Sequence, residues 1–139
     1  MASTIRALTS YRIGCSVVLG LLVALGLASK FSGVWGYAWV NDGVGDGLYE
    51  MFWIWLVGSW KVRWPVGKIA IAVFFITALI ECSQLIAFPP AWTSQLGWRL
   101  LLGTHFSWLD FLYYAVGCGL GAFSLGWFRQ VRLSSIGGG

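Results

Sequence analysis

The stretch VGKIAIAVFFITALIECSQLIAF, residues 66–88, decides the fold class. It follows Pro65 directly, ends before Pro89, and exceeds the ~20 apolar residues that a helix needs to cross a bilayer. Glu81 is unusual inside it, since a carboxylate costs roughly 2.5–3.5 kcal/mol at the centre of a membrane helix on insertion scales. A carboxylate so placed usually has a partner or faces a water-filled cavity. The stretch therefore predicts a membrane span that carries part of a polar site.

The composition of the whole chain agrees with a membrane protein. Its 139 residues are 58% hydrophobic and 10% charged, whereas a soluble domain carries about 25% charged residues. The ten tryptophans and nineteen glycines agree, because tryptophan gathers at the headgroup level and glycine is frequent in membrane helices. We expect residues 1–139 to form a single integral membrane domain. The net charge of +4 comes from scattered basic residues, which indicates membrane orientation and argues against nucleic-acid binding.

Four apolar runs predict an all-α, polytopic bundle of four transmembrane helices. The runs cover residues 13–29, 43–60, 66–88 and 109–128. The first run has an alternative, a signal peptide cleaved after Ala28, but its length favours a retained helix. The tail 133–139 is small and polar, and we expect it to be disordered.

The segment PPAWTSQLGWRLLLGTHFSW, residues 89–108, joins the last two runs. Its apolar centre is too short to cross a bilayer, and tryptophans suit the membrane interface. We therefore expect an interfacial or re-entrant segment here.

The three cysteines lie in separate runs without CxxC spacing, which favours packing roles over a disulfide or a zinc site. Likewise Gly117 and Gly121 form a GxxxG pair, which favours close helix packing.

Basic residues set the orientation through the positive-inside rule. With both termini in the cytoplasm, seven basic residues lie on the inner side and only Lys30 and Arg99 on the outer side. The seven are Arg6, Arg12, Lys61, Arg63, Lys68, Arg129 and Arg132.

The acidic residues then all fall in the outer half of the membrane. Glu81 lies 15 residues beyond Val66, so it has risen roughly 22 Å through a core about 30 Å thick. The other acids lie near the outer starts of the second and fourth spans. We predict that these spans and the loop form an outward-facing polar pocket lined by Asp46, Glu50, Glu81, Gln84, Arg99, His105, Asp110 and Tyr114.

Arg99 is the expected anchor of this pocket, because four carboxylates repel one another and it is the only fixed positive charge nearby. We expect Glu81 or Asp110 to bond to it. A purely structural alternative stays open. In that case Glu81 and Arg99 tie the loop down, while Asp46 and Asp110 act at helix starts through capping and the helix dipole.

The motifs GDGLYEMFWIW, ECSQL, WR and LLGTHFSWLDFLYYAVG, within residues 45–117, resemble a family of small bacterial four-helix membrane proteins of unknown function. The chain is also similar to VanZ-like proteins, which are linked to glycopeptide resistance. The matching positions are Asp46, Glu81, Gln84, Arg99, Asp110 and Gly117. One position departs from the VanZ-like pattern, because Tyr114 stands where an asparagine is expected. The resemblance implies a bacterial cytoplasmic (inner) membrane protein.

These observations predict binding of a cell-envelope component, such as a lipid headgroup or a cell-wall precursor. The partners would be the lipid bilayer, a lipid-linked ligand and a second membrane protein. Two alternatives stay open: a structural or assembly subunit, and a metal-assisted enzyme acting on a lipid-linked substrate. The carboxylates are hard oxygen ligands that suit Mg²⁺ or Ca²⁺, but the sequence assigns neither a metal site nor a cofactor.

Overall fold

The computed structural model describes residues 2–32, 36–83 and 108–133, which form four helices and contain no strand. The helices are α1 (Ala2–Ser32), α2 (Ala38–Trp60), α3 (Val66–Ser83) and α6 (Trp108–Leu133). The predicted all-α class is confirmed for this part of the chain.

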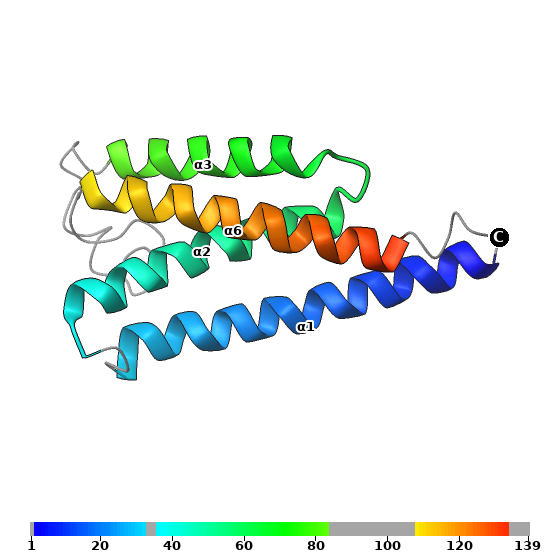
Figure 1. Cartoon of the computed structure of the whole chain (residues 1–139), viewed down its shortest axis with the longest axis horizontal. Helices are drawn as coiled ribbons and strands as arrows, with labels where there is room; N and C mark the ends of the chain where they lie inside the picture. Colours follow the sequence, from blue (N-terminus) through cyan, green and yellow to red (C-terminus); the bar gives the residue numbers. More distant parts are fainter. Residues whose placement is uncertain (1, 33–35, 84–107, 134–139) are drawn as a thin grey trace, which may run out of the picture.

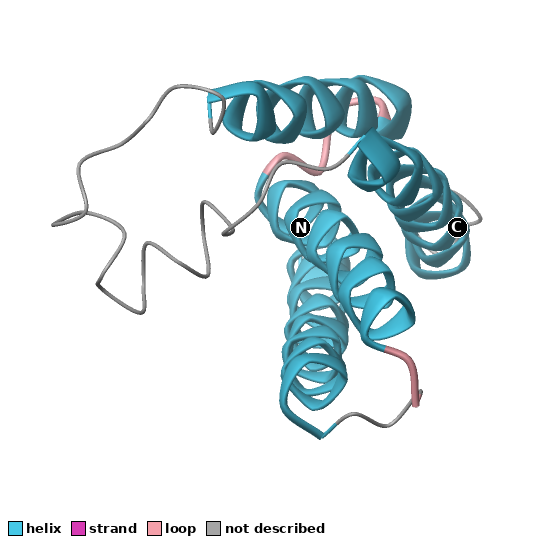
Figure 2. Cartoon of the chain, turned by 90° about the vertical axis from the view of Figure 1, so that its left-hand side faces the viewer, coloured by secondary structure: helices cyan, strands magenta, loops and turns pink. Residues whose placement is uncertain are grey.

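The helices run alternately in opposite directions (Figure 1). The start of α1 and the end of α6 therefore lie at the same end as the short turn between α2 and α3. Helix α2 is central, because it packs against α1, α3 and α6, and its contacts with α1 and α6 are the most extensive. Figure 2, turned by a right angle, shows a bundle and not a single layer.

Three of the four described helices are long and apolar enough to cross a membrane. The candidate spans are Ile5–Ser29, Val66–Ser83 and Trp108–Leu133. Large apolar side chains project from their outer faces, including Leu79, Phe123 and Trp127, each at least 65% exposed. Such surfaces belong against lipid. Helix α2 is not among these candidate spans, and it carries three acidic residues, the last of them at its middle.

The helix boundaries extend some of the predicted spans. Helix α1 begins at Ala2, well before the apolar run predicted from residue 13, and α2 begins at Ala38 instead of residue 43. Helix α6 continues to Leu133, beyond the predicted end at residue 128. Hydropathy finds the apolar part of a helix, but these helices continue into polar residues at their ends. Residues 84–88, the expected re-entrant segment and the tail 134–139 lie outside the described residues.

The core lies between α1, α2, α3 and α6 and includes Ile54, Ile69 and Leu125, all fully buried. Two glycines let α2 and α6 approach closely. A Cβ on Gly117 would lie 2.5 Å from the carbonyl oxygen of Gly47, and one on Gly121 would lie 3.2 Å from the Cα of Met51. The predicted packing role of this GxxxG pair is confirmed.

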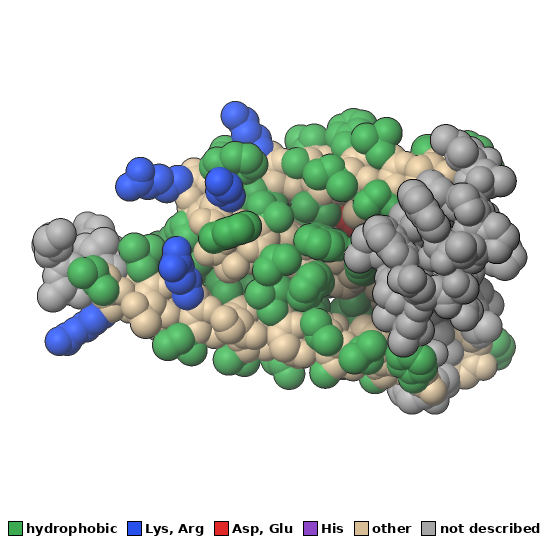
Figure 3. Space-filling model, turned by 180° about the vertical axis from the view of Figure 1, so that it is seen from behind, with side chains coloured by type: hydrophobic (Ala, Val, Ile, Leu, Met, Phe, Trp, Pro, Cys, Tyr) green, Lys and Arg blue, Asp and Glu red, His purple; other side chains and the backbone are tan. Residues whose placement is uncertain are grey.

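Basic side chains gather at the end of the bundle that holds the start of α1 and the end of α6 (Figure 3). Arg129, near the end of α6, is only 9% exposed. Its guanidinium donates to the Tyr11 hydroxyl at 3.2 Å and to the carbonyl oxygens of Trp64 at 2.7 Å, Gly58 at 2.9 Å and Lys61 at 3.3 Å. The Tyr11 hydroxyl also donates to Gly58 O at 3.0 Å.

This arrangement, which we call the Arg129 network, connects α1, α2, α6 and the turn after α2. The last carbonyl groups of a helix have no partner within the helix, and a cation near them is favourable. The sequence pattern predicts only a role in orientation for Arg129. Its role in joining the helices is a finding of the structure.

Candidate functional site

The carboxylate end is the opposite end of α2, α3 and α6, where α2 and α6 begin and α3 ends. It comprises Asp46, Glu50, Glu81, Asp110 and Tyr114, five of the eight residues predicted to line a pocket. Because residues four apart share one face of a helix, Asp46 lies above Glu50 on α2 and Asp110 above Tyr114 on α6. The remaining three predicted residues, Gln84, Arg99 and His105, lie outside the described residues.

Glu81 is joined to α6 by a hydrogen bond. The Tyr114 hydroxyl donates to Glu81 Oε2 at 2.9 Å, and both residues are buried, at 8% and 4% exposure. Glu81 therefore faces the interior of the bundle and not the lipid. Asp46 and Asp110 also lie close enough to Tyr114 for their charges to act on its hydroxyl. Acidic groups from three helices thus gather around one phenol.

Glu50 is fully buried one helical turn further along α2. The Cys118 thiol donates to Glu50 Oε2 at 3.1 Å, while Oε1 has no hydrogen-bond partner among the described residues. Thr77 of α3 lies beside this carboxyl group. Its hydroxyl, however, lies 3.0 Å from the carbonyl oxygens of Val73 and Phe74 and donates within its own helix. A buried carboxyl group beside a thiol, which is a weak donor, and a threonine hydroxyl that also bonds within its own helix is poorly satisfied.

Cys118 is the site residue that the sequence analysis missed. It packs in the core, as expected of the cysteines, but it also contacts a carboxyl group. The spacing of Cys118 from two predicted site residues is a sequence signal for this contact. Asp110, Tyr114 and Cys118 are spaced by four residues and therefore follow one face of α6. The polar face of α6 reaches one turn deeper than predicted.

The carboxylate end can accept hydrogen bonds and attract positive charge. Carboxylate oxygens are acceptors; here a phenol donates to Glu81 and a thiol donates to Glu50. Residues 2–32, 36–83 and 108–133 contain no group of three or more histidine, cysteine or acidic side chains placed to hold a metal ion. Arg99 lies outside these ranges, so its predicted contact with Glu81 or Asp110 stays a prediction.

Comparison with known proteins gives one match. Residues 35–118 match the model of a family described as a protein of unknown function (DUF2809). This region is more than half of the chain and includes α2, α3 and the part of α6 that reaches Cys118. No curated protein and no solved structure matches the chain.

Proposed function

The chain belongs to the DUF2809 family of proteins of unknown function, and we propose that its carboxylate end binds a component of the cell envelope. The ligand is a lipid headgroup or a cell-wall precursor that offers hydrogen-bond donors, such as sugar hydroxyls or an ammonium group. Binding takes place at the outer face of a bacterial inner membrane. The similarity to VanZ-like proteins is part of this proposal.

The proposed topology has all four helices crossing the membrane, α2 included, with both termini in the cytoplasm. Two observations support it. The alternating helices bring the seven basic residues assigned to the inner side to one end of the bundle. Helix α2 packs against three apolar helices, which can shield its acidic first half from lipid. In this topology the segment 89–107 lies over the carboxylate end as an interfacial or re-entrant loop.

The observation that carries the proposal is the burial of Glu81 against Tyr114, with Asp46 and Asp110 nearby. Ionisable residues within membrane helices are costly and commonly mark a ligand or ion pathway. Here the acids belong to three different helices and lie near one hydroxyl, which donates to Glu81. An acceptor-rich end of this kind is complementary to a ligand rich in donors. Arg99, Gln84 and His105 would complete the pocket, with Arg99 suited to a phosphate.

A structural role is the second candidate, and the two hydrogen bonds favour it. The Tyr114–Glu81 bond joins α6 to α3, and the Cys118–Glu50 bond joins α6 to α2. In this role the carboxylates would hold three helices in register, within the chain alone or as a subunit of a larger membrane complex.

Binding to purified protein in lipid nanodiscs separates the two candidates. The probes are phosphatidylethanolamine and a lipid-linked cell-wall precursor, and the variants are Asp46→Asn and Glu81→Gln, which keep side-chain shape while removing charge. The matched control is Ser16→Ala, an exposed position on α1 whose hydroxyl bonds only to its own helix.

We expect wild type and the control to bind one probe and both site variants to bind it about tenfold more weakly or less, equivalent to at least ~1.4 kcal/mol. Unchanged binding in both site variants, or no binding of either probe to wild type, would overturn the proposal. Unchanged binding with reduced thermal stability would favour the structural role.

A further inference from the structure

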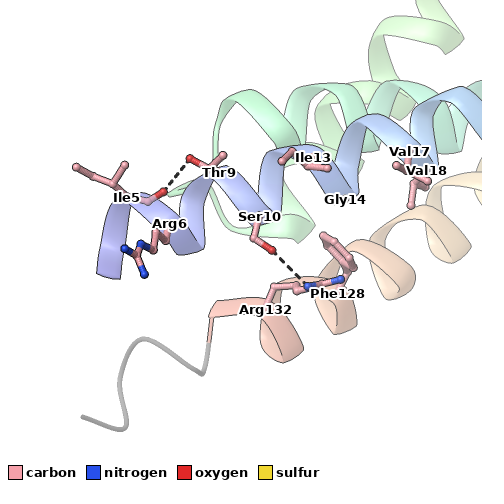
Figure 4. A pocket seen from close by; sticks show the side chains of 10 residues that line it. All are labelled: Ile5, Arg6, Thr9, Ser10, Ile13, Gly14, Val17, Val18, Phe128 and Arg132. Atoms are coloured by element: carbon pink, nitrogen blue, oxygen red, sulfur yellow. Dashed lines mark hydrogen bonds between the residues drawn. The ribbon is translucent and has the colours of Figure 1, made fainter. Parts of the chain in front are cut away.

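A groove between α1 and α6 lies at the basic end of the bundle, away from the carboxylate end. It has a volume of about 650 Å³. Helix α1 lines it with residues that include Arg6, Ser10, Ile13 and Val17, and α6 lines it with Phe128 and Arg132 (Figure 4). The groove therefore has a polar part near the start of α1 and an apolar part further along that helix.

Residue spacing explains why the groove forms. Arg6, Ser10, Ile13 and Val17 are separated by three or four residues, which places them along one face of α1. Gly14 lies on the same face, and a Cβ there would lie 2.5 Å from Cζ of Phe128. The two helices approach at this glycine.

The polar part carries two positive charges. Arg132 Nη1 donates to Ser10 Oγ at 3.3 Å, and its guanidinium carbon lies 5.6 Å from the centre of the Phe128 ring. Arg6 is exposed one turn before Ser10 on α1. No acidic side chain lines the groove within the part of the chain that the structure describes. Its charge is therefore complementary to an anion, and its hydroxyl groups can donate further hydrogen bonds.

We propose that this groove binds an anionic phospholipid of the leaflet at the basic end of the bundle. The phosphate lies between Arg6 and Arg132, where guanidinium groups can bind it through paired hydrogen bonds. An acyl chain follows Ile13 and Val17 toward the middle of the bilayer, since both lie within the candidate span Ile5–Ser29. Basic pockets between membrane helices on the cytoplasmic side are suited to acidic lipid headgroups.

The apolar part of the groove is what distinguishes this occupant from a free phosphate. Exposed arginines at a membrane surface attract any anionic lipid weakly through charge alone. Because the groove continues along an apolar face of α1, it can also contact an acyl chain of the same phospholipid. This proposal does not depend on ligand binding at the carboxylate end, which lies at the other end of the bundle.

Native mass spectrometry of the full chain tests the proposal with phosphatidylglycerol and with phosphatidylcholine of identical acyl chains. The variants are the double substitution Arg6→Gln with Arg132→Gln, which removes the charges, and Ile13→Trp, which fills the apolar part. The matched control is Arg12→Gln, because Arg12 is exposed on the same helix but does not line the groove. Glycerol 3-phosphate serves as a headgroup without chains.

We expect phosphatidylglycerol to bind wild type at least about tenfold more tightly than phosphatidylcholine. The double substitution and Ile13→Trp should each remove most of that binding, whereas Arg12→Gln should leave it within about twofold, and glycerol 3-phosphate should bind far more weakly. Equal binding of the two lipids would overturn the proposal. So would losses of equal size in Arg12→Gln and the double substitution, or full binding by Ile13→Trp, since each outcome would indicate attraction by surface charge alone.

Discussion

The two ends of the bundle differ in how their buried ionisable side chains are hydrogen-bonded. At the basic end, Arg129 has four hydrogen-bond acceptors drawn from α1, α2 and the turn that follows α2. At the carboxylate end, Glu50 is fully buried, a weak thiol donor bonds to one of its oxygens, and the other oxygen has no hydrogen-bond partner among the described residues.

This difference in hydrogen bonding suggests a different role for each end of the bundle. Removing a buried charge whose hydrogen bonds are satisfied leaves its partners unsatisfied and is strongly destabilising, whereas a buried polar group with too few partners itself costs free energy. Arg129 is in the first situation, and Glu50 is in the second. Proteins keep costly groups where function requires them, often at the expense of stability. We therefore expect the basic end to hold the helices together and the carboxylate end to be retained for binding.

The largest effect should come from breaking the Arg129 network. Arg129→Gln leaves carbonyl groups at the end of α2 without their charged donor, and we expect the free energy of unfolding to fall by about 3 kcal/mol or more. Steric trapping in bicelles measures this quantity. Arg12→Gln is the control: this residue is exposed beside Tyr11 on α1, so the loss should stay below about 0.5 kcal/mol. Equal losses in the two variants would contradict the assigned role of Arg129.

An intermediate effect should follow from separating α2 and α6. Gly117→Ala places a Cβ 2.5 Å from a backbone oxygen of α2, which cannot move without shifting the helix. We expect a loss of about 1–3 kcal/mol in unfolding free energy. Gly119→Ala on the same helix meets nothing within 4 Å and should be neutral or stabilising by up to about 1 kcal/mol. A tolerated Gly117→Ala would mean that this close approach is not needed.

The smallest effect should come from Cys118. Cys118→Ala removes the thiol donor beside Glu50, whereas Cys118→Ser replaces it with a hydroxyl donor of similar size. Because a thiol is a weak donor, we expect Cys118→Ala to differ from wild type by less than about 1 kcal/mol in unfolding free energy. A difference of several kcal/mol would mean that the hydrogen bond to Glu50 stabilises the fold about as much as the Arg129 network does. The two ends would then not differ in their contribution to stability.

Hydropathy was sufficient to predict the helical class and the general position of the described helices. The start of α3 at Val66 is as predicted, because Pro65 favours a helix start there. The GxxxG pair was also interpreted correctly from spacing alone. The ends of α1 and α6 were placed too close to the apolar runs, since a helix can continue into water where hydropathy gives no signal.

The site was predictable only in part. Spacing placed Asp46 with Glu50 and Asp110 with Tyr114, because both pairs lie within one helix. The bonds from Tyr114 to Glu81 and from Cys118 to Glu50 join different helices, and no sequence period specifies such pairings. The sequence predicts only an orienting role for Arg129 for a similar reason, since its partners belong to other elements. Its acceptors are backbone carbonyls, which are present at every position and leave no mark in the sequence.

The unfolding free energy of Glu50→Met tests the central claim most directly. Methionine fills a similar volume and removes a carboxyl group that is fully buried and poorly satisfied. If the carboxylate end is retained for binding, we expect the variant to be more stable than wild type by about 1 kcal/mol or more, because the cost of burying the carboxyl group disappears. A fall of more than about 1 kcal/mol would contradict the account and show that this end, like the Arg129 network, holds the bundle together.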